Sequence, residues 1–161
     1  MNYQIKLYFQ EFLQGATLME KKKYAEAIEH FQNSLNSYDE SKEKEHNCSC
    51  YQNIAECYRM LEDYEEAAMN YMDALDMNPK LEYEYLKLAE CCLNINTGNS
   101  VNTATEYLNQ CLNHFPNNTE ALINLGIANI LLGRNSEAKE ALLKAERLGN
   151  KDARKYITEN L

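Results

Sequence analysis

The sequence predicts an all-α fold, an α-solenoid built from about four pairs of antiparallel helices. The 161 residues include only five glycines and two prolines, and the charged and apolar residues are strong helix formers throughout. Runs of alternating apolar and polar residues, which would indicate strands, are scarce. Small residues also recur at fixed distances along the chain, which indicates a repeated supersecondary unit.

Four blocks share one pattern, and each is predicted to form the second helix of a pair. They cover residues 22–35, 62–75, 100–113 and 134–147. The first small residue of each block is followed seven residues later by another small residue, and a bulky apolar residue lies between them. The first small residues are Ala27, Ala67, Ala104 and Ala138; the bulky ones are Phe31, Tyr71, Leu108 and Leu142; the second small ones are Ser34, Ala74, Cys111 and Ala145.

A helical segment with its own small residue precedes each block and is predicted to form the first helix of the pair. These small residues are Gly15, Ala55, Ala89 and Gly126, at spacings of 40, 34 and 37. Two insertions, within residues 36–47 and 96–103, account for the differences and leave a period of 34 residues. Small residues are expected where two helices cross closely, because helix axes there approach to about 8–10 Å.

With these small residues and a proline at the unit's end, the chain resembles the tetratricopeptide repeat (TPR) family. Repeat two is the best match, at Ala55, Tyr58, Tyr64, Ala67, Tyr71, Ala74 and Pro79. Repeat one is the loosest, because Glu11 and Gln14 occupy positions where the pattern has large apolar residues. The resemblance implies a right-handed superhelix in a single domain, residues 1–161, with repeats at about 8–41, 48–81, 82–118 and 119–149.

Local signals predict where individual helices begin and end. Thr103 and Glu106 have the spacing of a capping box, which would begin the second helix of repeat three. Asn118 or Thr119 is expected to cap the first helix of repeat four, and Gly149 to end the last repeat in a left-handed conformation. Residues 151–161, with Ala153, Tyr156 and Ile157 as an inner face, are expected to form a C-terminal capping helix.

The charge balance excludes some classes of partner. The formal net charge of -9 and a pI near 4.9 argue against nucleic-acid binding, which needs clustered Lys and Arg. The N-terminus lacks the features of a signal peptide, and no apolar run is long enough for a membrane span. The sequence therefore predicts a cytoplasmic protein without membrane association, whose six cysteines are reduced thiols.

The sequence carries no catalytic motif, so we expect a protein that is not an enzyme and needs no cofactor or metal. The glycines form no phosphate-binding loop, and G-x-S-x-G and H-E-x-x-H are absent. His30 and His114 are expected to be solvated or partly packed.

Cysteines and one histidine gather near the start of repeat two, and they support an alternative interpretation. His46, Cys48, Cys50 and Cys57 lie close in sequence, which would suit a metal-binding or redox regulatory protein. The spacing of HNCSC differs from the C-x2-C pairs of zinc sites, however. Cys57 and Cys111 also occupy positions where small residues suit helix packing, so we favour a structural role.

The resemblance implies that first helices line a concave surface where a peptide or helix of a partner binds. Aligning the repeats with the family places twelve residues of this chain on that surface. They are Phe9, Phe12, Leu13, Gln52, Asn53, Glu56, Arg59, Tyr83, Lys87, Glu90, Asn124 and Ile127. An equally weighted alternative is that the apolar stripe of Phe9, Phe12 and Leu13 packs against the N-terminal residues or forms a homodimer contact.

One subclass of the family clamps the C-terminal carboxylate of heat-shock chaperones with Lys, Arg and Asn side chains. The corresponding positions here hold Phe12, Ala16, Asn53, Tyr83 and Lys87, so the paired cations are missing. We therefore expect no chaperone-tail binding.

The predicted function is a non-enzymatic interaction scaffold or adaptor for a partner protein or peptide with apolar and basic character. A second interpretation is a small acidic chaperone for a secreted or assembly-prone client.

Overall fold

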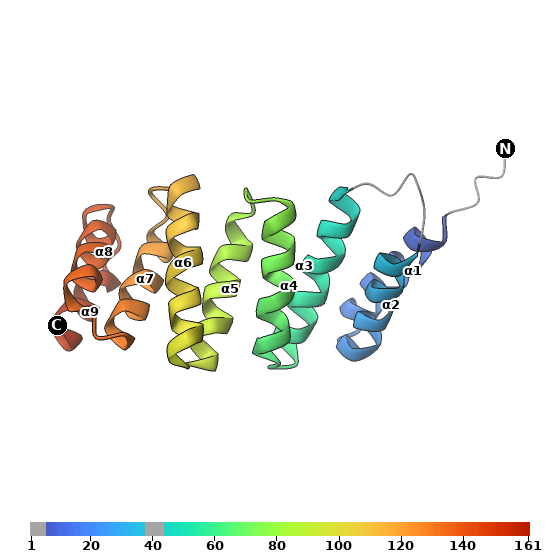
Figure 1. The fold of residues 1–161 in the computed structure, drawn as a ribbon, viewed down its shortest axis with the longest axis horizontal. Coiled ribbons are helices and arrows are strands. Elements are labelled where there is room, and N and C mark those ends of the chain that lie inside the picture. Colours follow the sequence, from blue (N-terminus) through green and yellow to red (C-terminus); the bar gives the residue numbers. More distant parts are fainter. Residues whose placement is uncertain (1–5, 38–43) are drawn as a thin grey trace. The chain divides into compact units, whose positions relative to one another are not determined.

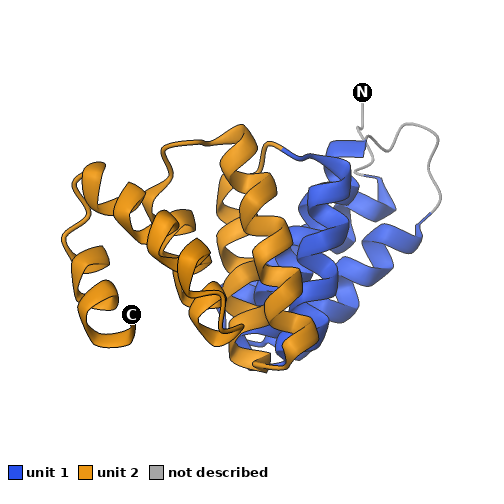
Figure 2. Cartoon of the chain, turned by 60° about the vertical axis from the view of Figure 1, so that its left-hand side comes forward, with its two compact units in different colours: residues 1–79 blue, residues 80–161 orange. Residues whose placement is uncertain are grey.

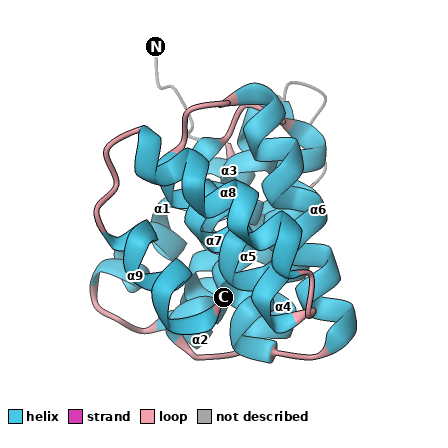
Figure 3. Ribbon diagram, turned by 90° about the vertical axis from the view of Figure 1, so that its left-hand side faces the viewer, coloured by secondary structure: helices cyan, strands magenta, loops and turns pink. Residues whose placement is uncertain are grey.

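The computed structural model describes residues 6–37 and 44–161, and the ordered elements of this part of the chain are nine α-helices without a strand (Figures 1 and 3). The helices divide between two compact units, residues 1–79 (unit 1) and 80–161 (unit 2) (Figure 2). The fold is an all-α solenoid of helix-turn-helix repeats, as the sequence predicts. The right-handed superhelix and the single domain stay predictions.

Unit 1 contains two helix pairs, α1 (Leu7–Glu20) with α2 (Tyr24–Asn36) and α3 (Lys44–Met60) with α4 (Tyr64–Met77). Helix α2 also packs against α3, which joins the two pairs. Ala27, Ile28 and Phe31 of α2 meet Ile54 and Cys57 of α3 in the core. Helix α3 begins at Lys44, inside the insertion predicted within residues 36–47, and residues 38–43 lie outside the described part.

Unit 2 contains α5 (Glu82–Ile95) with α6 (Gly98–His114), α7 (Thr119–Leu131) with α8 (Asn135–Arg147), and the terminal helix α9 (Asp152–Asn160). Helix α9 packs against α8 and α7. Its Ala153 is fully buried beside Leu142 and Ala145, with Tyr156 and Ile157 packed around them. The inner face expected for the capping helix is therefore present.

The small residues lie where the sequence places the helix crossings. The twelve pattern residues named for the four second-helix blocks are each at most 1% exposed. At Gly15 an added Cβ would lie 2.9 Å from the Phe31 ring, and at Gly126 it would lie 2.5 Å from Cγ of Leu142. In repeats one and four the paired helices therefore approach so closely that the bulky residue of the second helix covers the small residue of the first.

The turn inside each pair passes through a left-handed residue at one register position. Lys22, Glu62, Asn96 and Gly133 have positive φ values of 59°, 61°, 52° and 69°. Each follows the small residue of its first helix by seven positions. After three of these residues the next amide N–H donates to a carbonyl five residues earlier, as Asp63 does to Tyr58 at 3.0 Å. One backbone conformation thus reverses the chain in all four repeats.

The helix caps confirm two predictions and correct one. Asn118 caps α7 by accepting from the amide of Ala121 at 2.7 Å, and Gly149 follows α8 with φ 94°. The predicted capping box at Thr103 and Glu106 is wrong, because α6 begins at Gly98 and Thr103 lies inside it. Thr97 is the cap: its hydroxyl accepts from the amide of Ser100, and the Ser100 hydroxyl accepts from the amide of Thr97. The inserted residues therefore lengthen the helix.

Candidate functional site

A hollow of about 350 Å³ lies between the first helices of unit 2, which we call the α5–α7 hollow. Its walls come from α5 (Leu86, Glu90, Leu93 and Asn94) and α7 (Glu120 and Asn124). Glu90 and Asn124 are candidates from the sequence, so the structure brings these two predicted residues to one hollow. Ile127 is half-buried on α7 but does not line it.

The other candidates of α5 lie along the same helix, one turn apart. Tyr83 is 52% exposed, and Nζ of Lys87 lies 5.4 Å from the centre of its ring. The same ammonium group is 2.7 Å from Oε2 of Glu90. This i, i+4, i+7 row presents an aromatic face, a cation and a carboxylate on one side of α5. The pairing between Lys87 and Glu90 reduces the charge that either group offers alone.

The four candidates of α3 in unit 1 are half-buried and partly held by their own neighbours. Arg59 makes a two-point contact with Glu56, at 2.6 Å and 3.0 Å. The hydroxyl of Tyr71, a buried residue of α4, donates to the same carboxylate at 2.8 Å. These bonds fix the Glu56 and Arg59 side chains in one arrangement. Asn53 Nδ2 donates to the carbonyl of Ser49 in its own helix. Gln52 directly precedes Asn53 in the sequence.

The apolar candidates of α1 differ from one another in exposure. Phe9 and Leu13 are 43% and 44% exposed. Phe12 is half-buried, and its ring lies 5.4 Å from that of Phe31 and 5.2 Å from the His46 imidazole. Phe12 therefore belongs in part to the core of unit 1, whereas Phe9 and Leu13 offer apolar surface.

Glu11, one of the two polar residues of α1 that fit the repeat pattern poorly, is paired in the structure. Oε2 of Glu11 lies 2.7 Å from Nδ1 of His30 on α2. This contact between the paired helices replaces the apolar packing expected there and accounts for the partly packed environment of His30.

Two residues of the cysteine and histidine group come together in unit 1. His46 Nε2 lies 3.6 Å from Cys50 Sγ and 2.8 Å from Ser34 Oγ. The Ser34 hydroxyl donates its proton to the carbonyl of Tyr8 at 2.6 Å, so Nε2 of His46 must be the donor to Ser34. A nitrogen that already carries a proton cannot accept the thiol proton of Cys50. In this arrangement Nε2 of His46 serves as the donor to Ser34 and not as a base for Cys50.

The remaining cysteines are distributed through the helix contacts. Cys48 Sγ donates to the carbonyl of Ala74, and Cys57 lies in the core of unit 1. Within residues 6–37 and 44–161, no three His, Cys, Asp or Glu side chains lie together as a metal site. Burial raises the pKa of Cys57 to about 12 and the pKa of Cys92 and Cys111 to about 11. Thiols with such pKa values remain protonated and poorly nucleophilic near neutral pH.

A second hollow of unit 2 lies among α6, α7 and α8, and the sequence did not predict it. The sequence feature that could have indicated this hollow is Asn129, three residues after the small residue Gly126 of α7. Repeat two has Tyr58 at that register position, repeat one has Leu18 and repeat three has Cys92. An asparagine there replaces bulk with a polar amide.

Antiparallel helix pairs that cross at small residues, with exposed side chains on their first helices, define a helix-turn-helix repeat protein. Two family models, both described as Tetratricopeptide repeat, match residues 11–80 and 99–156 and together cover most of the sequence. The chain belongs to the tetratricopeptide repeat family. No curated protein sequence matches it.

Solved structures of repeat proteins share the fold at low sequence identity. "Crystal structure of YrrB: a TPR protein with an unusual peptide-binding site" has a TM-score of 0.75 at 16% identity, covering 94% of this chain and 74% of that one. "Crystal structure of MamA" has a TM-score of 0.72 at 19% identity, covering 91% and 81%. "First TPR of Spaghetti (RPAP3) bound to HSP90 peptide SRMEEVD" has a TM-score of 0.62 at 18% identity, covering 70% and 88%.

Helix length and hydropathy bear on the membrane prediction. No helix in the described part of the chain combines the length and apolar character that crossing a bilayer requires. The cytoplasmic location stays a prediction.

Proposed function

We propose that this protein is a non-catalytic interaction scaffold that binds a segment of a partner polypeptide on the exposed faces of its first helices. The observation that carries the proposal is the α5–α7 hollow. Two of its lining residues, Glu90 and Asn124, are positions that the repeat register assigns to ligand contact. A hollow of about 350 Å³ is large enough for a side chain of the bound segment.

The chemistry of these faces favours a partner segment with apolar anchors and basic residues. Tyr83 on α5 and Phe9 and Leu13 on α1 are exposed apolar side chains that a partner would cover. Glu90 and Glu120 place two carboxylates at the α5–α7 hollow. The net charge of -9 attracts basic segments over a longer range.

The same residues separate this proposal from recognition of an acidic C-terminus. Lys87 is the cation at the clamp positions, and its ammonium group is paired with Glu90 at 2.7 Å. Phe12, Ala16 and Tyr83 provide no charge-assisted donor for a carboxylate. The peptide SRMEEVD, which the Spaghetti (RPAP3) repeat domain binds, should therefore bind this chain much more weakly than a basic, apolar segment does.

The experiment identifies a partner by affinity capture, narrows the bound segment to a synthetic peptide and measures its affinity by calorimetry. Tyr83→Ser with Asn124→Ala should weaken binding at least about tenfold if the first helices of unit 2 make the contact. Phe9→Ser with Leu13→Ser tests unit 1 in the same way. Phe12 is avoided because its ring packs on Phe31.

A matched control removes equally exposed apolar side chains elsewhere. Met69 and Leu148 are 47% and 41% exposed, and neither is on a first helix. The variant Met69→Ser with Leu148→Ser should bind the peptide as the unaltered chain does. If the first-helix variants bind as tightly as this control, the proposal is wrong. If light scattering shows a dimer that Phe9→Ser with Leu13→Ser dissociates, that surface serves self-association instead.

A further inference from the structure

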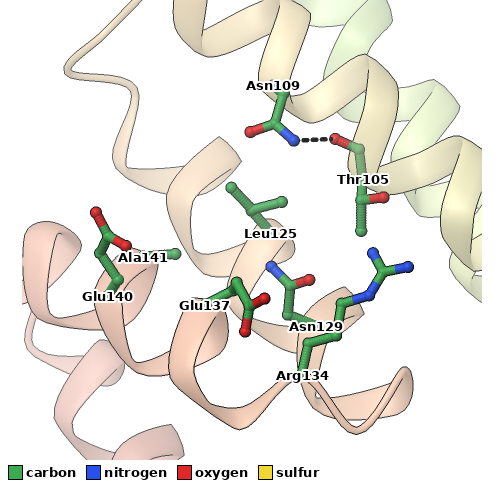
Figure 4. Close-up of a pocket in the computed structure, with 8 residues that line it drawn as sticks. All are labelled: Thr105, Asn109, Leu125, Asn129, Arg134, Glu137, Glu140 and Ala141. Atoms are coloured by element: carbon green, nitrogen blue, oxygen red, sulfur yellow. Dashed lines mark hydrogen bonds between the residues drawn. The ribbon is translucent and has the colours of Figure 1, made fainter.

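The second hollow of unit 2 has a volume of about 390 Å³ and lies among α6, α7 and α8 (Figure 4). We call it the α6–α8 hollow. Its apolar floor is Leu125 and Ala141, which are 9% and 6% exposed. None of its lining residues lines the α5–α7 hollow, so the two are separate surfaces of unit 2.

At the α6–α8 hollow, repeat four has an asparagine where repeat two has an aromatic residue. Asn129 follows Gly126 by three positions, as Tyr58 follows Ala55. Tyr58 packs with its phenyl ring against the core of unit 1. The shorter Asn129 leaves the corresponding space in repeat four open.

The side chain of Asn129 is largely buried, and its amide faces the open space of the hollow. The residue is 5% exposed, and its side chain forms no hydrogen bond with any described residue. Figure 4 shows the amide directed into the hollow, between Glu137 and Arg134. A ligand that supplies both a donor and an acceptor would satisfy this amide at the wall of the hollow.

The other polar groups of the hollow are mainly acceptors. Glu137 and Glu140 form no ion pair with a described residue. Asn109 donates its Nδ2 to the carbonyl of Thr105 at 2.8 Å, which leaves its Oδ1 as an acceptor (Figure 4). The cation of the hollow, Arg134, donates to Oδ1 of Asn102 at 2.8 Å. Two carboxylates against one guanidinium give the site a net negative charge.

We propose that the α6–α8 hollow binds the guanidinium group of an arginine side chain on a partner polypeptide. A guanidinium has five N–H donors in a plane and no acceptor, which complements two carboxylates and the Asn129 Oδ1. The aliphatic part of the arginine lies over Leu125 and Ala141. Nδ2 of Asn129 donates to a main-chain carbonyl of the same segment, so the site selects arginine within a polypeptide.

The test is an NMR titration of the full chain with an acetylated and amidated Gly-Arg-Gly peptide, following the side-chain amides of Asn109 and Asn129. The same peptide with citrulline keeps the shape and loses the charge. We expect the arginine peptide to shift both amides at millimolar concentration and the citrulline peptide to bind at least about tenfold more weakly. A lysine peptide should also bind more weakly than the arginine peptide.

Two variants test the residues. Asn129→Tyr places in repeat four the side chain that repeat two has there, and it should abolish binding by filling the hollow. Glu137→Gln with Glu140→Gln should weaken binding about tenfold. Both positions are exposed, so this variant tests the site even if Asn129→Tyr does not fold. The control, Glu106→Gln with Glu159→Gln, removes the same charge from exposed positions of unit 2 outside the hollow.

The control should bind the arginine peptide within about twofold of the unaltered chain. The proposal is overturned if neither amide shifts, if citrulline or lysine peptides bind as well as arginine, or if the control loses as much affinity as Glu137→Gln with Glu140→Gln. It is also overturned if a folded Asn129→Tyr chain still binds. These outcomes do not depend on ligand binding at the α5–α7 hollow.

Discussion

Replacing Gly126 by alanine tests directly whether small residues set the helix crossings. The new Cβ would lie 2.5 Å from Cγ and 2.7 Å from Cδ2 of Leu142. Carbon atoms pack best at about 3.5–4.0 Å, so the contact is about 1 Å too short. Leu142 is fully buried and Cγ is its branch point, so the side chain cannot turn away into solvent.

The expected cost is the difference between two terms. Overpacking a core by one methyl group costs about 1–3 kcal/mol. Alanine is about 1 kcal/mol better than glycine inside a helix, which offsets part of this cost. We therefore expect Gly126→Ala to destabilise the protein by up to about 2 kcal/mol. Gly15→Ala should cost less, because its Cβ would lie 2.9 Å from the Phe31 ring edge.

Urea denaturation followed by far-UV circular dichroism measures the effect, with Gly98→Ala as the control. Gly98 is the first residue of α6, and a Cβ added there meets nothing within 4 Å. Its replacement should be neutral or stabilising by up to about 1 kcal/mol. Equal urea midpoints and slopes for Gly126→Ala and Gly98→Ala would refute the close crossing.

Three further predictions concern the turns, a cap and the buried thiols. Glu62→Gly should stabilise the protein by about 1 kcal/mol in urea denaturation, because Glu62 has φ 61° and a left-handed conformation is unfavourable for residues with a Cβ; no gain would contradict the turn geometry. Thr97→Ala should cost about 1 kcal/mol, and Thr103→Ala less than about 0.5 kcal/mol, in the same assay; the reverse order would restore the sequence-predicted cap. Burial raises the pKa of Cys111 from 9.0 to about 11, so the unfolded chain loses this proton at lower pH than the native chain and stability falls as pH rises from about 9 to 11. Cys111→Ala should lessen that fall and leave the pH dependence below pH 9 unchanged; an unaltered alkaline fall would show that the thiol is not responsible.

The sequence predicts the repeated features of the fold because each has a local physical cause. Ala67 and Ala74 are small because two helices cross there, and both are fully buried. Asn118 caps α7 because its side chain can accept an amide proton that the helix leaves unpaired. Gly149 adopts φ 94°, which only glycine tolerates well. These signals depend on neighbours along one or two helices and can be read without coordinates.

Features that depend on competition between signals could not be predicted. Thr97 and Thr103 both have a cap residue's side chain, and the pattern with Glu106 favoured the wrong one. Lys22 and Glu62 gave no sign of a left-handed conformation, since glycine or asparagine is the usual marker. Their shared position, seven residues after the crossing, is apparent only when the four turns are compared.

The charged candidate residues on the first helices show another limit of prediction from sequence. Register places Glu56, Arg59, Lys87 and Glu90 on first helices. It does not reveal that Arg59 forms an ion pair with Glu56, or that Lys87 forms one with Glu90. A partner that uses any of these charges must compete with an existing ion pair. These pairs are half-buried, so a charged ligand that breaks one of them must replace its hydrogen bonds. Glu137 and Glu140, which form no ion pair with a described residue, require no such exchange.

Recognition in a repeat protein should depend on the residues that differ between repeats, because the residues that recur are used to pack the helices. The position three residues after the crossing illustrates this, since it holds Leu18, Tyr58, Cys92 and Asn129 in turn. Cys92 is buried, and burial raises its thiol pKa to about 11, so this position in repeat three is apolar in character. Asn129 is 5% exposed and brings an amide that lines the α6–α8 hollow. The difference between these residues changes no helix crossing, and it converts a packing position into a site with unpaired polar groups.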